Sequence, residues 1–138
     1  MIALDQRGHG RSSTFTHPAR YGTAMADDVV RLLDRLHVRR AHLVGHSMGA
    51  LVAANIAARY PERVASAALV AAPLYADSAA AAGTGDPLLV NGRALAARWP
   101  GARLLEVPGA DHAGVIARPE VLAAVRALLR QPSAPGTH

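Results

Sequence analysis

A serine between two glycines has the surroundings that best suit nucleophilic chemistry in this chain. Residues 45–49 read Gly-His-Ser-Met-Gly, after the apolar run 41–44 and before the helix-forming run 50–57. A strand, a sharp turn with serine at its apex and a helix expose a hydroxyl as a nucleophile. Because glycine has no Cβ, we expect strand and helix to pack closely while Ser47 takes a strained backbone conformation. The N-terminus of the helix would then direct free N–H groups beside Ser47.

A serine hydroxyl becomes a good nucleophile when a base removes its proton, and a histidine oriented by a carboxylate is the usual base. His112 is the predicted base. It ends the segment Pro-Gly-Ala-Asp-His, directly after a predicted strand. Catalytic side chains gather at the carboxyl ends of parallel strands, which is where this loop would lie.

Three aspartates follow Ser47 and are candidates for the carboxylate: Asp77, Asp86 and Asp111. Asp86 is preferred, at the end of Gly-Thr-Gly-Asp and of a possible strand. Asp111 is less suitable because sequence neighbours usually point apart, which would keep it from the His112 ring. Asp77 precedes the alanine run and would lie at the wrong end of that strand. Asp86 also suits a second role, as the N-cap of a helix that begins at Pro87.

The remaining histidines suggest neither a metal nor a cofactor. His9 lies in the loop after the first predicted strand, His46 adjoins the nucleophile, and His37 and His42 suit structural or exposed positions. None has metal-ligand spacing with a partner, so we predict no metal site. The Gly-His-Gly of residues 8–10 lacks the full dinucleotide-binding spacing, so we predict no such cofactor.

Alternating apolar runs predict an α/β fold with a mostly parallel sheet of about five strands and helices on both faces. The periodicity places Met25, Val29, Leu32, Leu33 and Leu36 on one face of the first helix. One domain is expected over residues 1–130, followed by a flexible polar tail at 131–138. The predicted helices are 23–36, the helix that includes the run 50–57 and continues to about residue 59, 87–99, and 120–130. The predicted strands are 2–4, 41–44, 64–72, a weak one at 79–82, and 103–107.

Composition narrows the functional classes. The 138 residues include no cysteine, so disulfides and thiolate metal sites are excluded. The net charge of +5 comes from dispersed arginines, and aromatic side chains for base stacking are few, so we expect no nucleic-acid partner. No apolar run reaches membrane-spanning length and no secretory pattern opens the chain, so we expect no membrane association and a cytoplasmic location.

With these residues in view, the chain resembles part of an α/β-hydrolase-fold enzyme of the lidded esterase, lactonase and carbon–carbon hydrolase group. The resemblance spans nearly the whole chain, and its motifs are specific for the fold and weakly specific for the substrate. The matching segments are Asp-x-x-Gly-His-Gly-x-Ser at 5–12, the nucleophile elbow at 45–49 with the segment 59–64 after its helix, the acid loop at 83–86 and the histidine loop at 108–112.

The resemblance implies a role for each residue of a serine hydrolase site. Ser47 would be the nucleophile, His112 the general base and Asp86 its orienting carboxylate, with the Met48 N–H as one oxyanion donor. A small ester or related acyl substrate would form an acyl-enzyme on Ser47, which water would then cleave. Serine at the apex argues against the dehalogenase and epoxide-hydrolase branches. No cofactor is implied.

Two departures from the family pattern shape the expectations. The family's preceding strands and its histidine–glycine loop have no counterpart before Met1, so we expect a truncated member whose exposed sheet edges invite self-association. The cap is reduced to residues 74–82, so the pocket should be open. We further expect strand 2–5 to pair directly with strand 41–44, which would bring loop 6–10 toward Ser47. The alternative to an enzyme is a non-catalytic remnant or binding module that retains the triad residues.

Overall fold

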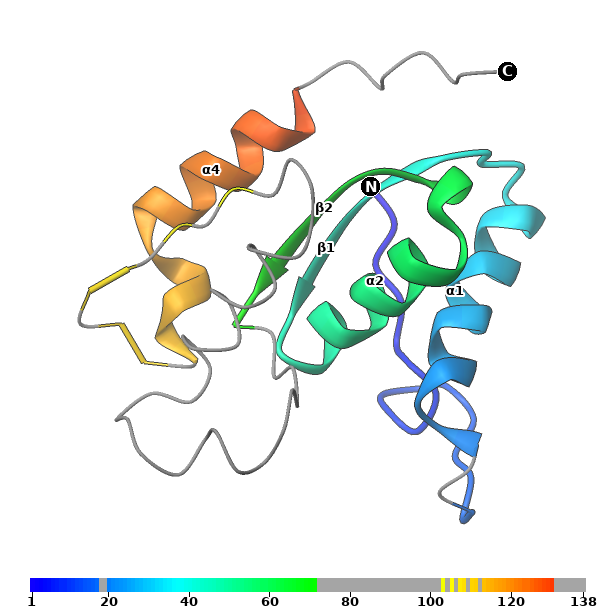
Figure 1. Cartoon of the computed structure of the whole chain (residues 1–138). Helices are drawn as coiled ribbons and strands as arrows, with labels where there is room; N and C mark the ends of the chain where they lie inside the picture. Colours follow the sequence, from blue (N-terminus) through cyan, green and yellow to red (C-terminus); the bar gives the residue numbers. More distant parts are fainter. Residues whose placement is uncertain are drawn as a thin grey trace.

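The computed structural model describes residues 1–17, 20–71, 103, 105, 107, 108, 110, 111 and 113–130. Helices and parallel strands alternate along it (Figure 1), which confirms the predicted α/β class. Among the described helices, none is long and apolar enough to cross a membrane. The elements are α1 (Thr23–Arg35), β1 (Ala41–His46), α2 (Met48–Arg59), the short 3-10 helix η2 (Pro61–Arg63), β2 (Val64–Val70), the 3-10 helix η4 (Gly114–Ala117) and α4 (Pro119–Leu129).

The two strands lie parallel, with α2 as the connection between them. Their register runs from His42 opposite Ser66 to His46 opposite Val70. Figure 1 shows α1 and α2 on one side of the strands and α4 on the other, so the expectation of helices on both faces holds. Both strands point their carboxyl ends toward the turn that starts α2, which places Ser47 at that edge.

The main core lies between α1, α2 and one face of the sheet. Ile56 of α2 is 1% exposed, and the strand residues Leu43 and Val64 pack against the same cluster. The predicted apolar face of α1 is confirmed in part: Leu33 is buried, whereas Leu36 caps the helix and is 48% exposed. The buried members of this cluster are Met25, Ala26, Val29, Val30, Val52 and Ile56.

The helix α4 buries less of its apolar face than α1 does. Val121 is 6% exposed, while Leu122 and Leu129, which the sequence places on the same apolar face, are 42% and 44% exposed. It packs against β2 of the described sheet. The helix predicted at 120–130 is therefore confirmed in position, and only part of its apolar face is covered by the described chain.

The sequence predicts about five strands, and the described residues form two of them. Strand 41–44 extends to His46, and the run 64–72 forms β2 up to Val70. Residues 2–4 are in no strand, and neither are Arg103, Leu105 and Val107. The expected strand 79–82 and helix 87–99 lie outside the described residues.

The expected pairing of residues 2–5 with β1 is wrong. Within the described chain, β1 pairs with β2 only. Ile2 is 47% and Leu4 39% exposed, so the apolar side chains of this segment find little to bury against. A strand gains stability from packing one face on a core, and without that packing a short extended segment does not pair stably.

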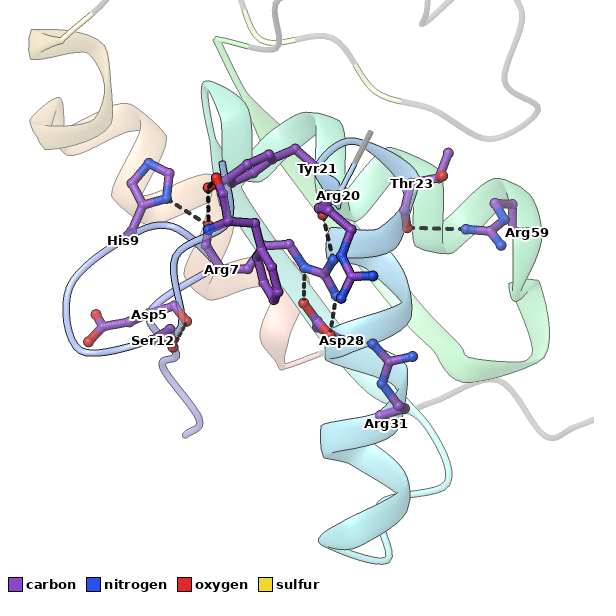
Figure 2. Close-up of polar contacts among 11 residues, drawn as sticks. Asp5, Arg7, His9, Ser12, Arg20, Tyr21, Thr23, Asp28, Arg31 and Arg59 are labelled. Carbon is purple, nitrogen blue, oxygen red and sulfur yellow. Dashed lines mark hydrogen bonds and ion pairs between the residues drawn. The ribbon is translucent and has the colours of Figure 1, made fainter. Parts of the chain in front are cut away.

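An arginine–aspartate network joins the N-terminal loop to α1 (Figure 2). The Arg7 guanidinium donates two hydrogen bonds to Asp28, Nε to Oδ2 at 2.5 Å and Nη2 to Oδ1 at 2.7 Å. The same guanidinium donates to the Arg20 carbonyl and lies 5.3 Å from the Phe15 ring centroid. Arg31 adds a further bond to Asp28. Bidentate pairing with a planar guanidinium fixes the loop in one orientation on the helix.

The neighbouring Asp27 ties α1 to the end of α2. The Tyr60 hydroxyl and the Arg59 guanidinium each donate to Asp27 Oδ1 at 2.8 Å. The Tyr60 hydrogen bond, helped by the Arg59 charge, lowers the pKa of Asp27, and the same bond raises the pKa of Tyr60. Two adjacent aspartates thus hold α1 from two directions.

Because of the Arg7–Asp28 pair, we expect the protein to lose stability in acid. Hydrogen bonds from Arg7 hold the pKa of Asp28 below its ordinary 3.8, so the folded protein keeps this carboxylate charged to lower pH than the unfolded chain does. The stability it contributes is present above pH 3.8 and is lost as the pH falls through the folded-state pKa. We expect Asp28→Asn to lower the free energy of unfolding by about 1–2 kcal/mol at neutral pH. Urea denaturation at several pH values measures this loss. The difference in the free energy of unfolding between Asp28→Asn and the parent should shrink below pH 3.8.

Asp34→Asn is the matched control. Asp34 pairs with Arg63 at 2.8 Å, but its side chain is 59% exposed, against 27% for Asp28. An exposed pair contributes little, so we expect a change below about 0.5 kcal/mol. Equal losses in the two variants would contradict the special role of Asp28.

Candidate active site

Ser47 occupies the turn between β1 and α2. Its backbone angles are φ 53° and ψ −118°, in a region that residues with a side chain rarely adopt. The sequence predicted a strand, a strained turn and a helix, and all three are confirmed at this position. Strain of this kind costs about 1–3 kcal/mol and persists only where the surrounding structure imposes it.

The close packing that imposes the turn depends on Gly45. A Cβ built there would lie 2.2 Å from the Gly49 carbonyl oxygen and 2.6 Å from the Ala50 nitrogen, both backbone atoms that cannot move aside cheaply. A Cβ at Gly49 would meet nothing within 4 Å. The sequence predicted that both glycines serve close packing, and the structure assigns that role to Gly45 alone.

Backbone hydrogen bonds fix Ser47 on both sides. Its N–H donates to the Val70 carbonyl at the end of β2, at 3.0 Å. Its carbonyl accepts from the Ala50 N–H at 2.9 Å, which starts the helix. Met48 is the first residue of α2, and a first-turn N–H has no acceptor within its own helix. This N–H and the positive end of the helix dipole therefore lie directly beside the serine.

Two of the five described histidines, His9 and His42, have hydrogen bonds that suit structural positions. His42 Nδ1 lies 2.7 Å from Ser66 Oγ on the neighbouring strand, and His9 Nδ1 lies 3.1 Å from the Arg7 carbonyl. His37 is exposed after α1, with φ 54°. His46, at the end of β1, is half-buried. Among the described residues, no group of three or more His, Cys, Asp or Glu side chains could hold a metal ion.

The proposed partners of Ser47 lie outside the described residues. These are Asp86 and His112, together with the alternative carboxylate Asp77. The third candidate acid, Asp111, is described: its Oδ1 accepts from the Gly114 N–H at 2.5 Å, at the start of η4. Its carboxylate therefore has a local structural role in the loop after residue 110.

The motif at residues 5–12 forms a self-supporting loop. The Asp5 carboxylate accepts from the Arg11 N–H at 3.0 Å, and the Ser12 hydroxyl donates to the Asp5 carbonyl at 2.7 Å. Gly8 and Gly10 have φ of 79° and 53°, and a Cβ at Gly10 would lie 2.3 Å from the Asp5 carboxyl. Residue spacing here therefore encodes a loop conformation.

A hollow of about 630 Å³ lies between this loop and α1. Its floor includes the Arg7–Asp28 pair and the Phe15 ring. Ser47 is not among the residues that line this hollow.

Comparison with known proteins places this geometry in a family. The sequence profile of the alpha/beta hydrolase fold matches residues 1–86, which include the self-supporting loop, the elbow and both strands. The chain belongs to the alpha/beta hydrolase fold family. The resemblance inferred from the motifs is thereby confirmed, since the matched region carries the Ser47 turn in its strand–turn–helix setting.

Relatives within the hydrolase family have varied names. A dihydrolipoyllysine-residue acetyltransferase component of an acetoin cleaving system from Pseudomonas putida is 44% identical over 71 residues, covering 51% of this chain and 19% of that protein. A protein provisionally named carbamate hydrolase RutD from Variovorax paradoxus (strain S110) is 47% identical over 70 residues, covering 51% of this chain and 26% of that protein. The match thus spans about a fifth to a quarter of these relatives.

The match to one solved structure covers more of this chain than the matches to these relatives do. The crystal structure of a hydrolase from Pseudomonas aeruginosa PA01 is 27% identical, with a TM-score of 0.49. The match covers 94% of this chain and 48% of that one, so this chain spans about half the length of that hydrolase.

The elbow geometry predicts opposite outcomes for its two glycines. Gly45→Ala would force β1 and α2 apart, because its Cβ meets backbone at 2.2 Å, and we expect a loss of about 3 kcal/mol or more in the free energy of unfolding. Gly49→Ala adds a methyl group in open space within a helix, and we expect a gain of up to about 1 kcal/mol. Urea denaturation followed by circular dichroism measures both. Similar effects in the two variants would contradict the assigned packing.

Proposed function

We propose that this chain carries the nucleophile of a serine hydrolase that acts on small ester or related acyl substrates. The observation that carries the proposal is the strained backbone of Ser47 at the junction of β1 and α2. That strain presents the hydroxyl at the carboxyl edge of the strands, next to the first free N–H of a helix. An idle serine in a glycine-rich turn needs no such conformation, and holding it costs stability.

The chemistry follows from these positions and from the sequence motifs. His112, oriented by Asp86, takes the proton from Ser47 Oγ as the oxygen attacks the acyl carbon. The Met48 N–H donates to the oxyanion that forms, in the field of the helix N-terminus. His112 then passes the proton to the leaving alcohol, and an acyl-enzyme remains. Water activated by the same imidazole adds to the acyl carbon, releases the acid and restores Ser47.

The choice of Asp86 as the acid is supported by what Asp111 does. The Asp111 carboxylate accepts the Gly114 N–H at the start of η4, and Val115 N–H donates to the Asp111 carbonyl at 3.1 Å. A residue that holds its own loop in this way is poorly suited to orient the neighbouring His112 ring.

The relatives support acyl chemistry without naming one substrate. One is named for acetyl transfer and another for carbamate hydrolysis, and acetyl groups and carbamates both contain a carbonyl carbon that a nucleophile can attack. We therefore propose a small molecule with an ester-like carbonyl as the substrate, with no metal or organic cofactor in the reaction.

A fluorophosphonate probe tests the proposal. We expect covalent labelling of the parent protein at Ser47, no labelling of Ser47→Ala, and a fall of about 10³-fold or more in the labelling rate of His112→Ala, because the proton acceptor is lost. Rates come from gel fluorescence over time, and tryptic mass spectrometry identifies the modified residue.

Asp86→Asn and Asp111→Asn form the matched pair of acid variants. We expect the first to lower the labelling rate about 10²-fold or more and the second to leave it within about threefold. Folded protein, verified by circular dichroism, that resists the probe would contradict the enzyme and favour a non-catalytic binding module. A larger loss in Asp111→Asn than in Asp86→Asn would reverse the assignment of the acid.

A further inference from the structure

The hollow between the N-terminal loop and α1 is lined by residues that the proposed reaction does not use. Its volume of about 630 Å³ lies within the range typical of sites for small organic molecules. Apolar and charged side chains share its lining. A ligand that fits this hollow would therefore need both an apolar part and a polar or charged group.

The charge around the hollow favours an anion. Four arginines line it or contact a residue that does: Arg7, Arg11, Arg20 and Arg31. Two aspartates line it, Asp5 and Asp28. The next acidic residue of α1, Asp27, is paired with Arg59 and does not change this balance. Four positive charges against two negative ones leave a local positive potential, which attracts an anionic ligand.

Arg11 is the arginine of the lining that has donors to offer. The Nε, Nη1 and Nη2 atoms of Arg7 already donate, to Asp28 and to the Arg20 carbonyl (Figure 2). Arg11 is exposed, and within the described chain only its backbone N–H has a partner, the Asp5 carboxylate. The Ser13 hydroxyl, on the same loop, also has no hydrogen bond within the described chain. One guanidinium and one hydroxyl thus remain to bind a ligand.

The apolar part of the lining suits an aliphatic chain. Leu4 is 39% exposed, and Leu32 of α1 and Phe15 are half-buried. Covering such surfaces is favourable in proportion to the apolar area removed from water. A planar guanidinium pairs with a carboxylate through two parallel hydrogen bonds, a geometry that fits a carboxylate better than a single-point anion.

We propose that this hollow binds a small carboxylate with an aliphatic chain. The Arg11 guanidinium and the Ser13 hydroxyl hold the carboxylate, and the chain packs against Leu4 and Leu32. The acid released by the proposed hydrolysis belongs to this chemical class, and only that link rests on the proposed function. The binding itself depends on the loop and α1 alone.

Isothermal titration calorimetry with hexanoate tests the proposal. We expect a Kd of about 1 mM or tighter. Acetate lacks the chain and hexanol lacks the charge, so we expect each to bind about tenfold more weakly or worse. Equal affinities for acetate and hexanoate would contradict the apolar wall. Inorganic phosphate that binds more tightly than hexanoate would overturn the carboxylate assignment.

Arg11→Gln and Arg35→Gln are the matched pair of variants. Each removes one positive charge from an exposed position, but Arg35 lies in the last turn of α1 and is not among the lining residues. We expect the Kd for hexanoate to rise about 10-fold or more in Arg11→Gln and to stay within about twofold in Arg35→Gln. Equal changes would show unspecific attraction by net charge and overturn the inference.

Leu4→Ala provides a second measurement should Arg11→Gln fail to fold, which circular dichroism would reveal. It shortens the apolar wall, so we expect the Kd for hexanoate to rise about threefold or more while the Kd for acetate stays unchanged. A parental Kd for hexanoate in Leu4→Ala would contradict the proposed contact of the chain.

Ser47→Ala separates this inference from the proposed function. We expect its Kd for hexanoate to equal that of the parent, because Ser47 is not among the residues that line the hollow. Loss of hexanoate binding in Ser47→Ala would place the acid at the nucleophile and overturn the inference. If fluorophosphonate does not label the parent protein, the proposed function fails, and the Arg11→Gln titration still decides whether the hollow binds a carboxylate.

Discussion

Close backbone approach at Gly45 is the constraint on which the rest of the elbow depends. The Gly49 carbonyl and the Ala50 nitrogen occupy the space that a side chain at Gly45 would need. With α2 this near β1, the chain has room for a single residue to reverse direction between them, and Ser47 takes a φ of 53° to do so. The strain of the serine is thus a consequence of packing between two regular elements, and not a property of the serine itself.

The packing of α2 depends in turn on its other face. Ile56 and Val52 are buried against α1, and the contacts of Asp27 and Asp28 hold α1 in place. Asp27 bonds to the C-terminal end of α2, while Asp28 bonds to the N-terminal loop through Arg7. We therefore expect removal of either carboxylate to loosen the packing of α1 on α2. The Arg7–Asp28 ion pair and the backbone geometry of Ser47 are therefore linked through α1, which packs on α2.

The candidate chemistry combines groups from local and distant parts of the chain. Ser47 and the Met48 N–H come from one turn, so local sequence is enough to place them side by side. The Val70 carbonyl comes from the next strand and reaches Ser47 only because the parallel register brings the two strand ends level. In a parallel sheet every strand delivers its carboxyl end to the same edge, which is why distant residues can meet there.

Sequence alone determined α1, β1, α2, β2 and α4 to within a few residues, because apolar periodicity and glycine or proline boundaries are local signals. It also identified Ser47 as the apex of the turn. Only the tertiary structure decided that Gly45 and not Gly49 makes the close contact and that residues 2–5 do not pair with β1. Each of these depends on which surfaces meet across the fold, and a one-dimensional pattern carries no information on distances between segments far apart in the chain.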